Sequence, residues 1–404
     1  MFDLELIKLK LQPDAKALDI VGDVLDRLQN AVIKHNLDAE CVPGGSVAKG
    51  TFIGKDFDAD LFVRFSKRYK SDQLSDLLEP VMKSFKAVRV HGSRDYFQFT
   101  HKGIPFEAIP VLNIKHHKHS ENITDMSPLH VTYVQKFLTK KPQLADDIRL
   151  AKQFCKAASV YGAESHIAGI SGHVLDLLVL HYGGFMNFVQ RVAMWEEEEA
   201  VDPAGKTKHP RKNLNKSKIQ GPLIVVDPVQ ADRNAAAALS KRKYDLLRKT
   251  CIQFLEKPTE KFFEIKPLDM KKLLKKDAIV VKVTPLKGKQ DVVGSKIMKV
   301  YGFLKKGLAE HGFKVTDGGY DMSMIYLFVE EKKISTTYTH RGPPSTEKSR
   351  TDIFKKKWGK NVYEKDDRLH VERDRVHHEA EKCVSALLKD SYVKQRVTRC
   401  SLKR

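Results

Sequence analysis

The sequence lacks any run of about 18 apolar residues, the length that a helix needs to cross a membrane. Its first residues, MFDLELIKLKLQPDAK, mix charges among the leucines and do not form a secretion signal. Its five cysteines are scattered, without a C-x-x-C pair that would favour a zinc site or a disulfide framework. We therefore expect a cytoplasmic protein without a membrane span, whose cysteines are reduced thiols.

Acidic residues are also few relative to basic ones. The chain has 51 Asp and Glu against 72 Lys and Arg, a formal net charge of +21. Such an excess favours a polyanionic partner, because each phosphate that a cation neutralises releases condensed counterions. No basic amphipathic helix with an aromatic face is evident, so the charge favours a nucleic acid over a membrane surface. At 404 residues and 41% apolar, the chain is long enough for several domains with their own cores.

Hydrophobic spacing predicts a mixed α/β domain over residues 1–140. Apolar residues recur at helical spacing over residues 14–35, where Asp14 is placed to cap the helix. A second helix is expected over residues 71–85. Short strands, the last two joined by a hairpin at residues 101–103, are expected at 60–65, 87–92, 95–103 and 104–114.

Residues 141–256 predict a helical domain. The segment 144–159 has helical spacing, and the segment 170–195 is apolar nearly all round, so we expect it to be buried. The acidic run 196–199 is followed by a stretch rich in Lys and Arg, which predicts an exposed loop.

Residues 257–404 predict a third, α+β domain. A strand is expected at 278–283, a helix at 292–312, and then a hairpin whose turn is DGG at 317–319. The last stretch, from residue 341, is dense in Lys, Arg and His. The whole pattern predicts an α+β multidomain protein.

The segment GGSVAKGTFIGKDFDADLFVRF, residues 44–65, combines a Gly-Gly-Ser turn with alternating aspartates. Glycines let the backbone approach a triphosphate, and a serine hydroxyl donates to a phosphate oxygen. On a strand, the carboxylates of Asp56, Asp58 and Asp60 share one side. Mg²⁺ takes oxygen ligands, and two such ions serve in-line nucleotidyl transfer. A solvated strand edge is the alternative interpretation.

The same segment resembles the signature of the polymerase β nucleotidyltransferase superfamily, in which G-[GS] is followed after a spacer by [DE]-h-[DE]-h, with h apolar. Asp56 with Asp58 fits this signature, and so does Asp58 with Asp60. The signature alone does not choose between the two frames.

A longer resemblance, to the archaeal (class I) CCA-adding enzymes, covers most of residues 40–345. The matching stretches are GSVAKGT, DADLFVRF, GIPFEAIPV, SPLH, RLAKQFCKAASVYGAE, ISGHVLDLLVLHYGGF, VVDPVQADRNAAAALS and RGPP. The resemblance implies a polymerase β-like nucleotidyltransferase domain at 1–140, a helical domain at 141–256 and an α+β RNA-binding region at 257–404. It implies template-independent addition of C, C and A to the 3′ end of tRNA from CTP and ATP, with release of pyrophosphate, and repair of damaged CCA ends.

Position by position, the resemblance assigns a Mg²⁺ site of catalytic carboxylates. It makes Asp58 and Asp60 the first two ligands and leaves Asp56 in the loop before the strand. It makes Glu107 the third carboxylate, although the family usually has Asp at this position. A Glu there adds one methylene that the backbone has to absorb, and Glu107 as an outward-facing strand residue is the alternative.

The resemblance also implies six nucleotide-binding residues: Ser46, Lys49, His130, Lys152, Tyr161 and Arg233. Lys49 replaces the Arg common in the family, which keeps the charge and loses the bidentate fork. Arg233 matches an arginine that presents hydrogen-bonding groups to the incoming base. From the residues alone, Lys152 is a solvated lysine, His130 and Tyr161 are packing or turn residues, and Arg233 is a helix N-terminal cation or ion-pair partner.

The implied partners are ATP, CTP and tRNA, bound through its acceptor stem and TΨC arm by shape and phosphate contacts. Family members are often dimers, so a homodimer is also expected, and no membrane is. Two alternatives stay open: another RNA nucleotidyltransferase, such as a poly(A) or oligoadenylate synthase, and a non-catalytic RNA-binding protein with the same fold. The histidines of KHHKH at 115–119 suit no tetrahedral metal site and predict a solvated loop or RNA-facing patch.

Overall fold

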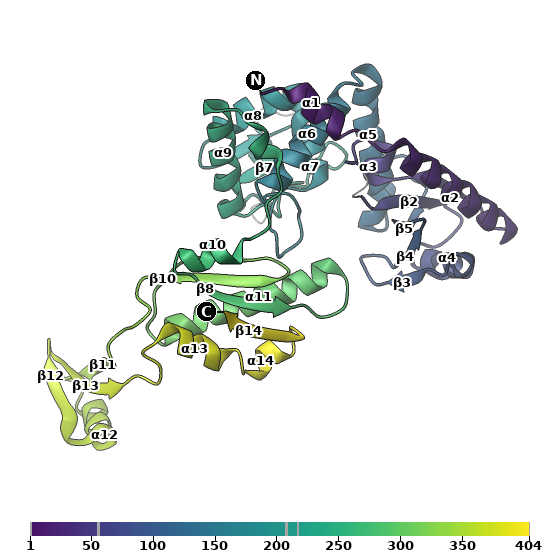
Figure 1. Cartoon of the computed structure of the whole chain (residues 1–404). Coiled ribbons are helices and arrows are strands. Elements are labelled where there is room, and N and C mark those ends of the chain that lie inside the picture. Colours follow the sequence, from purple (N-terminus) through teal and green to yellow (C-terminus); the bar gives the residue numbers. More distant parts are fainter. Residues whose placement is uncertain (1, 55–56, 207–208, 216–217, 404) are drawn as a thin grey trace. The chain divides into compact units, whose positions relative to one another are not determined.

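In a computed structural model the chain forms two compact units, Met1–Lys266 (unit 1) and Pro267–Arg404 (unit 2) (Figure 1). The structure describes residues 2–54, 57–206, 209–215 and 218–403. Both units mix helices and strands, which confirms the expected α+β class. No helix within the described ranges is long and apolar enough to cross a membrane.

Unit 1 contains a five-stranded mixed sheet. Its strands are β1 (Ala39–Pro43), β2 (Ala59–Phe65), β3 (Val88–Val90), β4 (Tyr96–His101) and β5 (Ile104–Leu112). Their order is β1-β2-β5-β4-β3, with β2 and β5 parallel and the other neighbours antiparallel. The parallel register sets Asp60 directly opposite Glu107. The expected hairpin is confirmed, because Lys102 and Gly103 have the positive φ values, 48° and 83°, that a tight two-residue turn requires.

Three helices accompany this sheet: α2 (Ala15–Lys34), α3 (Gly45–Ala48) and α4 (Leu74–Met82), whereas α1 (Leu4–Lys10) packs through Ile7 in the second core described below. The predicted long helix and its cap are confirmed, since the Asp14 carboxylate accepts a hydrogen bond from the backbone N of Lys16 at 3.0 Å. The buried face of α2 packs with apolar residues of the sheet in one core (Figure 1). This core supports the strands that carry Asp60 and Glu107.

The rest of unit 1 is mainly helical and has a second core. Its helices are α5 (Ser127–Lys140), α6 (Leu144–Ala157), α7 (Gly172–Tyr182), α8 (Phe185–Ala193) and α9 (Lys241–Glu256). Of the apolar segment 170–195, α7 is buried as expected, whereas α8 exposes one face that includes Met186. The segment forms two helices, because Gly183 and Gly184 take positive φ values of 80° and 131° that end α7. The acidic run does not lie wholly in a loop, since Glu199 begins β6 (Glu199–Val201), which pairs with β7 (Leu223–Val225) in parallel.

Unit 2 contains two antiparallel sheets. The larger has the order β14-β8-β10-β9, from β8 (Ile279–Thr284), β9 (Val315–Tyr320), β10 (Met324–Val329) and β14 (Arg399–Lys403). The smaller has the order β11-β13-β12, from β11 (Thr337–Pro344), β12 (Val362–Lys365) and β13 (Arg368–Asp374). The helices are α10 (Met270–Lys275), α11 (Gln290–Glu310), α12 (Lys348–Trp358), α13 (Ala380–Leu387) and α14 (Ser391–Lys394).

The prediction that DGG forms the hairpin turn of this region is wrong. Asp317, Gly318 and Gly319 lie inside β9, and the chain turns at Asp321–Ser323, where the Asp321 carboxylate accepts from the backbone N of Ser323 and Met324. A Cβ at Gly318 or Gly319 would come within 2.8 Å of Tyr326 atoms. The two glycines therefore serve close packing in the strand rather than a turn.

The short 3₁₀ helices are η1 (Ser71–Gln73), η2 (Lys83–Phe85), η3 (His117–His119), η4 (Ile123–Met126), η5 (Pro210–Asn213), η7 (Glu260–Phe263) and η8 (Gly359–Asn361). All five cysteines are free thiols, as the sequence predicts, and all except Cys400 are buried.

Candidate active site

The carboxylate group, defined as Asp58, Asp60 and Glu107, lies at the paired strands β2 and β5. Asp60 is on β2 directly opposite Glu107 on β5, and Asp58 is exposed just before β2 begins. Glu107 is oriented by Gln98 on β4, whose Nε2 donates to Glu107 Oε1 at 2.6 Å. The neighbouring Ala59 and Leu61 are buried in the core, so the strand alternation turns Asp60 to the other side. Asp56 lies outside the described residues.

The electrostatics of Asp60 are unusual for an aspartate. Burial raises its pKa to about 7, the negative charges of Glu107 and Asp58 add to the increase, and Lys49 opposes it. Like charges near a buried carboxylate are costly unless a cation neutralises them. Three carboxylates form a hard oxygen donor set that suits Mg²⁺, so these residues fit a divalent cation.

The Gly-Gly-Ser turn packs directly on Asp60. The backbone N of Gly44 donates to the Asp60 carbonyl at 2.7 Å, and Gly45 has a positive φ of 49°. A Cβ at Gly45 would lie 1.7 Å from Asp60 Oδ2, so a larger residue there would collide with the carboxylate. Ser46 follows on α3, half-buried. The turn therefore places Ser46 beside the carboxylate group.

The lysine clamp, defined as Lys49 and Lys152 with Asp176 between them, forms the next part of the site. Asp176 is a buried residue of α7, and its Oδ2 accepts from Lys49 Nζ. Its Oδ1 lies 3.2 Å from Lys152 Nζ, which also donates to Thr51 Oγ1 at 2.9 Å. Lys152 is buried on α6, so its interpretation as a solvated lysine is wrong.

Burial and the neighbouring charges together set the pKa values of Lys152 and Asp176. Burial lowers the pKa of Lys152 to about 8 and Lys49 lowers it further, while Asp176 opposes them. Burial would raise the pKa of Asp176, but Lys152 and Lys49 outweigh burial and the pKa is lowered. At neutral pH the clamp therefore carries two lysine charges around one carboxylate, a net positive charge.

Tyr161 lies next to this clamp. Burial raises the pKa of its hydroxyl, and the charge of Asp176 raises it further. A Cβ at Gly172 would come 2.8 Å from the Tyr161 hydroxyl and 3.6 Å from Lys152 Cε. Tyr161 and Lys152 therefore meet at the start of α7.

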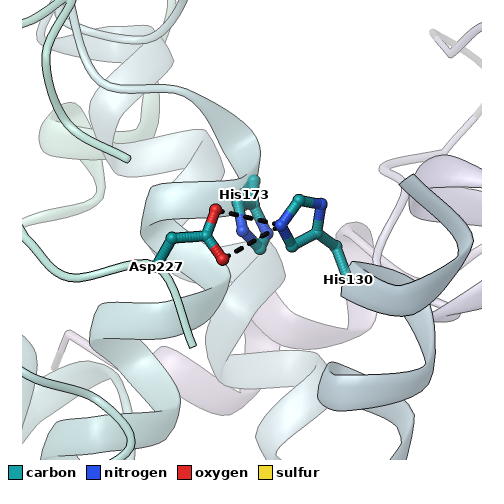
Figure 2. A group of neighbouring side chains, drawn as sticks. All are labelled: His130, His173 and Asp227. Atoms are coloured by element: carbon teal, nitrogen blue, oxygen red, sulfur yellow. Dashed lines mark hydrogen bonds and ion pairs between the residues drawn. The ribbon is translucent and has the colours of Figure 1, made fainter. Parts of the chain in front are cut away.

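The Asp227 cluster, defined as Asp227 with His130, His173 and Arg233, closes the site. The Asp227 oxygens lie 2.9 and 3.0 Å from His130 Nε2, as Figure 2 shows, and Oδ2 accepts from Arg233 Nη1 at 2.7 Å. The His173 ring contacts the His130 ring in a tilted arrangement, with ring centroids 4.5 Å apart and an interplanar angle of 50°. Arg233 is thus an ion-pair partner, as the residues alone suggested.

The three labelled residues of Figure 2 are also metal-ligand types. Among the described residues, they are the one set of three or more His, Cys, Asp or Glu side chains whose ligand atoms all lie within 4.8 Å of one another, so the carboxylate group does not meet that spacing. In the Asp227 cluster, however, Arg233 and His130 already engage both carboxylate oxygens. These contacts compete with a metal ion, and the cluster is better described as a hydrogen-bonded unit.

The protonation of the cluster follows from burial. Burial would raise the pKa of Asp227, but the hydrogen bond and charge of His130 and the backbone N of Val229 outweigh it, and the pKa is well below the usual range. Burial lowers the pKa of His173 to about 3, and the charges of His130 and Lys49 lower it further. At neutral pH Asp227 is therefore ionised and His173 is a neutral ring.

The sequence reasoning missed Asp176, Asp227 and His173. Asp176 had a signal, because a single carboxylate in the apolar helix GHVLDLLVLHY has to be paired when buried. Asp227 follows the fully buried LIVV in the same way. His173 had no comparable signal, since a histidine near a helix start is compatible with solvent.

Comparison with known proteins gives two family matches. The second domain of tRNA nucleotidyltransferases matches residues 146–264, and the C-terminal domain of CCA-adding enzymes matches residues 279–398.

Named relatives match over most of the chain. The CCA-adding enzyme of Nanoarchaeum equitans is 32% identical, with 88% of this chain and 87% of that protein covered. The CCA-adding enzyme of Methanoregula boonei is 27% identical over 88% and 79% of the two chains, and that of Saccharolobus islandicus is 26% identical over 94% and 90%.

Similar solved structures include the RNA terminal uridylyl transferase Cid1, with a TM-score of 0.54 and 14% identity over 66% of this chain and 98% of that one. The Cid1 poly(U) polymerase with Mg and 3′-dATP bound has the same TM-score and identity, over 65% and 98%. These likenesses support the nucleotidyltransferase fold of unit 1.

Proposed function

The chain belongs to the archaeal (class I) family of CCA-adding enzymes, and on that premise we propose which of its residues carry out the reaction. The enzyme is a tRNA nucleotidyltransferase that adds C, C and A to the 3′ end of tRNA from CTP and ATP without a template. The named relatives and the C-terminal family match are CCA-adding enzymes, and the other match is a tRNA nucleotidyltransferase domain, so a poly(A) or oligoadenylate synthase is not supported. We add as proposals the repair of damaged CCA ends, a cytoplasmic location and a homodimer.

The first proposal is that Asp58, Asp60 and Glu107 hold Mg²⁺. It is carried by one observation: Asp60 lies directly opposite Glu107, and desolvation together with the charge of Glu107 raises the pKa of Asp60 to about 7. When bound, Mg²⁺ makes the terminal ribose hydroxyl a better nucleophile and stabilises the leaving pyrophosphate. Gln98 orients Glu107, and Gly45 leaves the space that the Asp60 carboxylate occupies.

The second proposal is that the lysine clamp, Ser46 and Tyr161 bind the triphosphate. Its support is the net positive charge of the clamp and the closeness of Lys49 to Asp60, whose pKa it lowers. Asp176 holds both ammonium groups in fixed positions before the nucleotide arrives, which reduces the ordering cost of binding. His130 and Arg233 then contact the sugar and the base from the Asp227 cluster.

The third proposal concerns tRNA, whose acceptor stem and TΨC arm we assign to unit 2. The end of α12 carries Lys355, Lys356 and Lys357 in succession. Trp358 lies under Lys357 Nζ at 5.0 Å and under the Arg373 guanidinium at 4.4 Å. Cations around an aromatic ring suit a phosphate backbone, and a steep fall of tRNA affinity with salt is expected.

The activity is tested with a tRNA transcript that lacks its CCA end and with each labelled nucleotide in turn. Addition that stops after C, C and A supports the function, whereas open-ended addition of A, or no incorporation of C, contradicts it. Asp60→Asn should strongly reduce incorporation, and Glu40→Gln on the neighbouring strand β1 is the matched control that should leave it unchanged.

A further inference from the structure

Asp227 connects its own loop to α5 through one carboxylate. It is fully buried after β7, and it accepts hydrogen bonds from Arg233 Nη1 at 2.7 Å and from the backbone N of Val229 at 2.9 Å and Gln230 at 3.3 Å. Its oxygens also lie 2.9 and 3.0 Å from His130 Nε2 on α5 (Figure 2). Nearly every acceptor position of this carboxylate is used, which fixes its orientation.

The loop that carries Arg233 is closed on itself around Asp227. The backbone N of Asp227 donates to the Arg233 carbonyl at 3.0 Å, and the backbone N of Arg233 donates to the Gln230 carbonyl at 3.0 Å. A β-bridge between Val226 and Asn234 closes its base. Arg233 is therefore constrained at its backbone and at one guanidinium nitrogen.

The rest of the guanidinium is open to a ligand. The Arg233 side chain is 35% exposed, while the carboxylate that anchors it is inaccessible. A guanidinium has five N–H donors, and the hydrogen bond to Asp227 uses Nη1. An arginine fixed at one end and free at the other presents donors in a set direction, which hydrogen-bonded discrimination between bases requires.

The other side of Asp227 fixes His130 in the same way. The half-buried His173 ring contacts the His130 ring at a tilt of 50°, with centroids 4.5 Å apart. The His130 imidazole is thus held by the Asp227 carboxylate and by the neighbouring His173 ring. Because one carboxylate holds both side chains, the position of His130 and the direction of Arg233 depend on each other.

We propose that Asp227 is the residue that positions Arg233 and His130 for nucleotide selection, so that the enzyme favours CTP and ATP over UTP and GTP. This inference rests on the proposed contacts of Arg233 with the base and of His130 with the nucleotide. Asp227 itself touches neither nucleotide nor metal. A freed guanidinium samples several rotamers, and its donors then match the wrong bases more often.

The test measures kcat/KM for CTP and UTP on a tRNA that awaits its first C, with Asp227→Asn, Arg233→Ala and the double variant. Asp227→Asn should lower the CTP-to-UTP ratio by about 10- to 100-fold, the range of one good base contact. The double variant should be no less selective than Arg233→Ala alone, because the two residues act as one unit. General structural damage would instead lower the ratio further in the double variant, and that result contradicts the proposal.

Asp232→Asn is the matched control, since Asp232 is an exposed carboxylate of the same loop paired with Lys218 at 3.0 Å. It should leave the ratio unchanged. If Asp227→Asn does not fold at the assay temperature, Asp227→Glu decides, because it keeps the charge and displaces the carboxylate by one methylene. An unchanged ratio in the folded Asp227 variant overturns the proposal, and an unchanged ratio in Arg233→Ala overturns the assigned role of Arg233 instead.

Discussion

Two aspartates of unit 1, the half-buried Asp60 and the fully buried Asp176, differ in the direction of their pKa shift. Asp60 of the carboxylate group has like charges beside it, and its pKa rises to about 7. Asp176 of the lysine clamp has an ammonium group on each oxygen, and its pKa falls although its side chain is inaccessible. Burial acts in the same direction on both, so the neighbouring charges decide the difference.

The opposite pKa shifts indicate different roles for the carboxylate group and the lysine clamp. The carboxylate group is short of positive charge, so it has affinity for a cation that arrives from solution. The lysine clamp already contains its counter-charge, so Asp176 acts on the lysines and leaves them a net positive charge for the triphosphate. Asp60→Asn should therefore keep or raise stability, whereas Asp176→Asn should lower it. This difference in direction tests the comparison.

The largest effect is expected at Asp60. Asp60→Asn should lower kcat/KM for CCA addition by roughly 1000-fold, because a lost ligand removes several kcal/mol of charge stabilisation. In EDTA the variant should melt at the same temperature as the wild type or higher, since a costly buried charge has gone. A lower melting temperature in EDTA would show that other protein groups already neutralise the Asp60 charge without a metal ion.

At Asp176 we expect the substitution to lower stability. Asp176→Asn leaves the buried Lys152 and the half-buried Lys49 without a counter-charge and should lower the free energy of unfolding by about 3–5 kcal/mol. Urea unfolding measures this loss, and KM for both nucleotides should rise. The control is Asp245→Asn, which breaks the exposed pair with Lys241 and should cost under about 1 kcal/mol. Equal losses at both positions would remove the special role of Asp176.

The pH dependence of nucleotide binding should report the protonation of Lys152 in the lysine clamp. Lys152 loses its proton above a pKa of about 8, so KM for CTP should rise several-fold between pH 8 and pH 9.5. This lysine has a lowered pKa in the folded state, and its contribution to stability therefore increases over the same window, which separates the loss of binding from unfolding. Lys152→Arg should move the rise in KM to higher pH, whereas Lys156→Arg on the same helix should not.

The smallest effect is expected at Asp56. The resemblance places this residue in the loop before β2, so Asp56→Asn should change kcat/KM by less than about threefold, a fraction of the effect of losing a metal ligand. Equal losses for Asp56, Asp58 and Asp60 would show that the frame of the carboxylates was chosen wrongly.

The sequence predicts local structure better than partners across the fold. The strand that carries Asp60, the helix capped by Asp14 and the hairpin at Lys102 and Gly103 all follow from spacing within a few residues. The turn at Asp317–Gly319 was predicted wrongly, because the tyrosine that packs on these glycines comes from the neighbouring strand.

The candidate site shows the same limit. Residue types and the resemblance predicted Lys49, Lys152 and Arg233, but their carboxylate partners lie up to 127 positions away along the chain. Periodicity placed Lys152 on an amphipathic helix, and nothing in that helix reveals that α7 supplies Asp176. Charge pairing of this kind depends on tertiary packing.

The most direct measurement is Mn²⁺ binding, followed by electron paramagnetic resonance with a non-hydrolysable CTP analogue present. We predict that the wild type binds Mn²⁺, that Asp60→Asn loses this binding, and that Asp227→Asn keeps it, because the carboxylate group holds the cation and the Asp227 cluster does not. Retention of Mn²⁺ by Asp60→Asn together with its loss from Asp227→Asn would contradict the account.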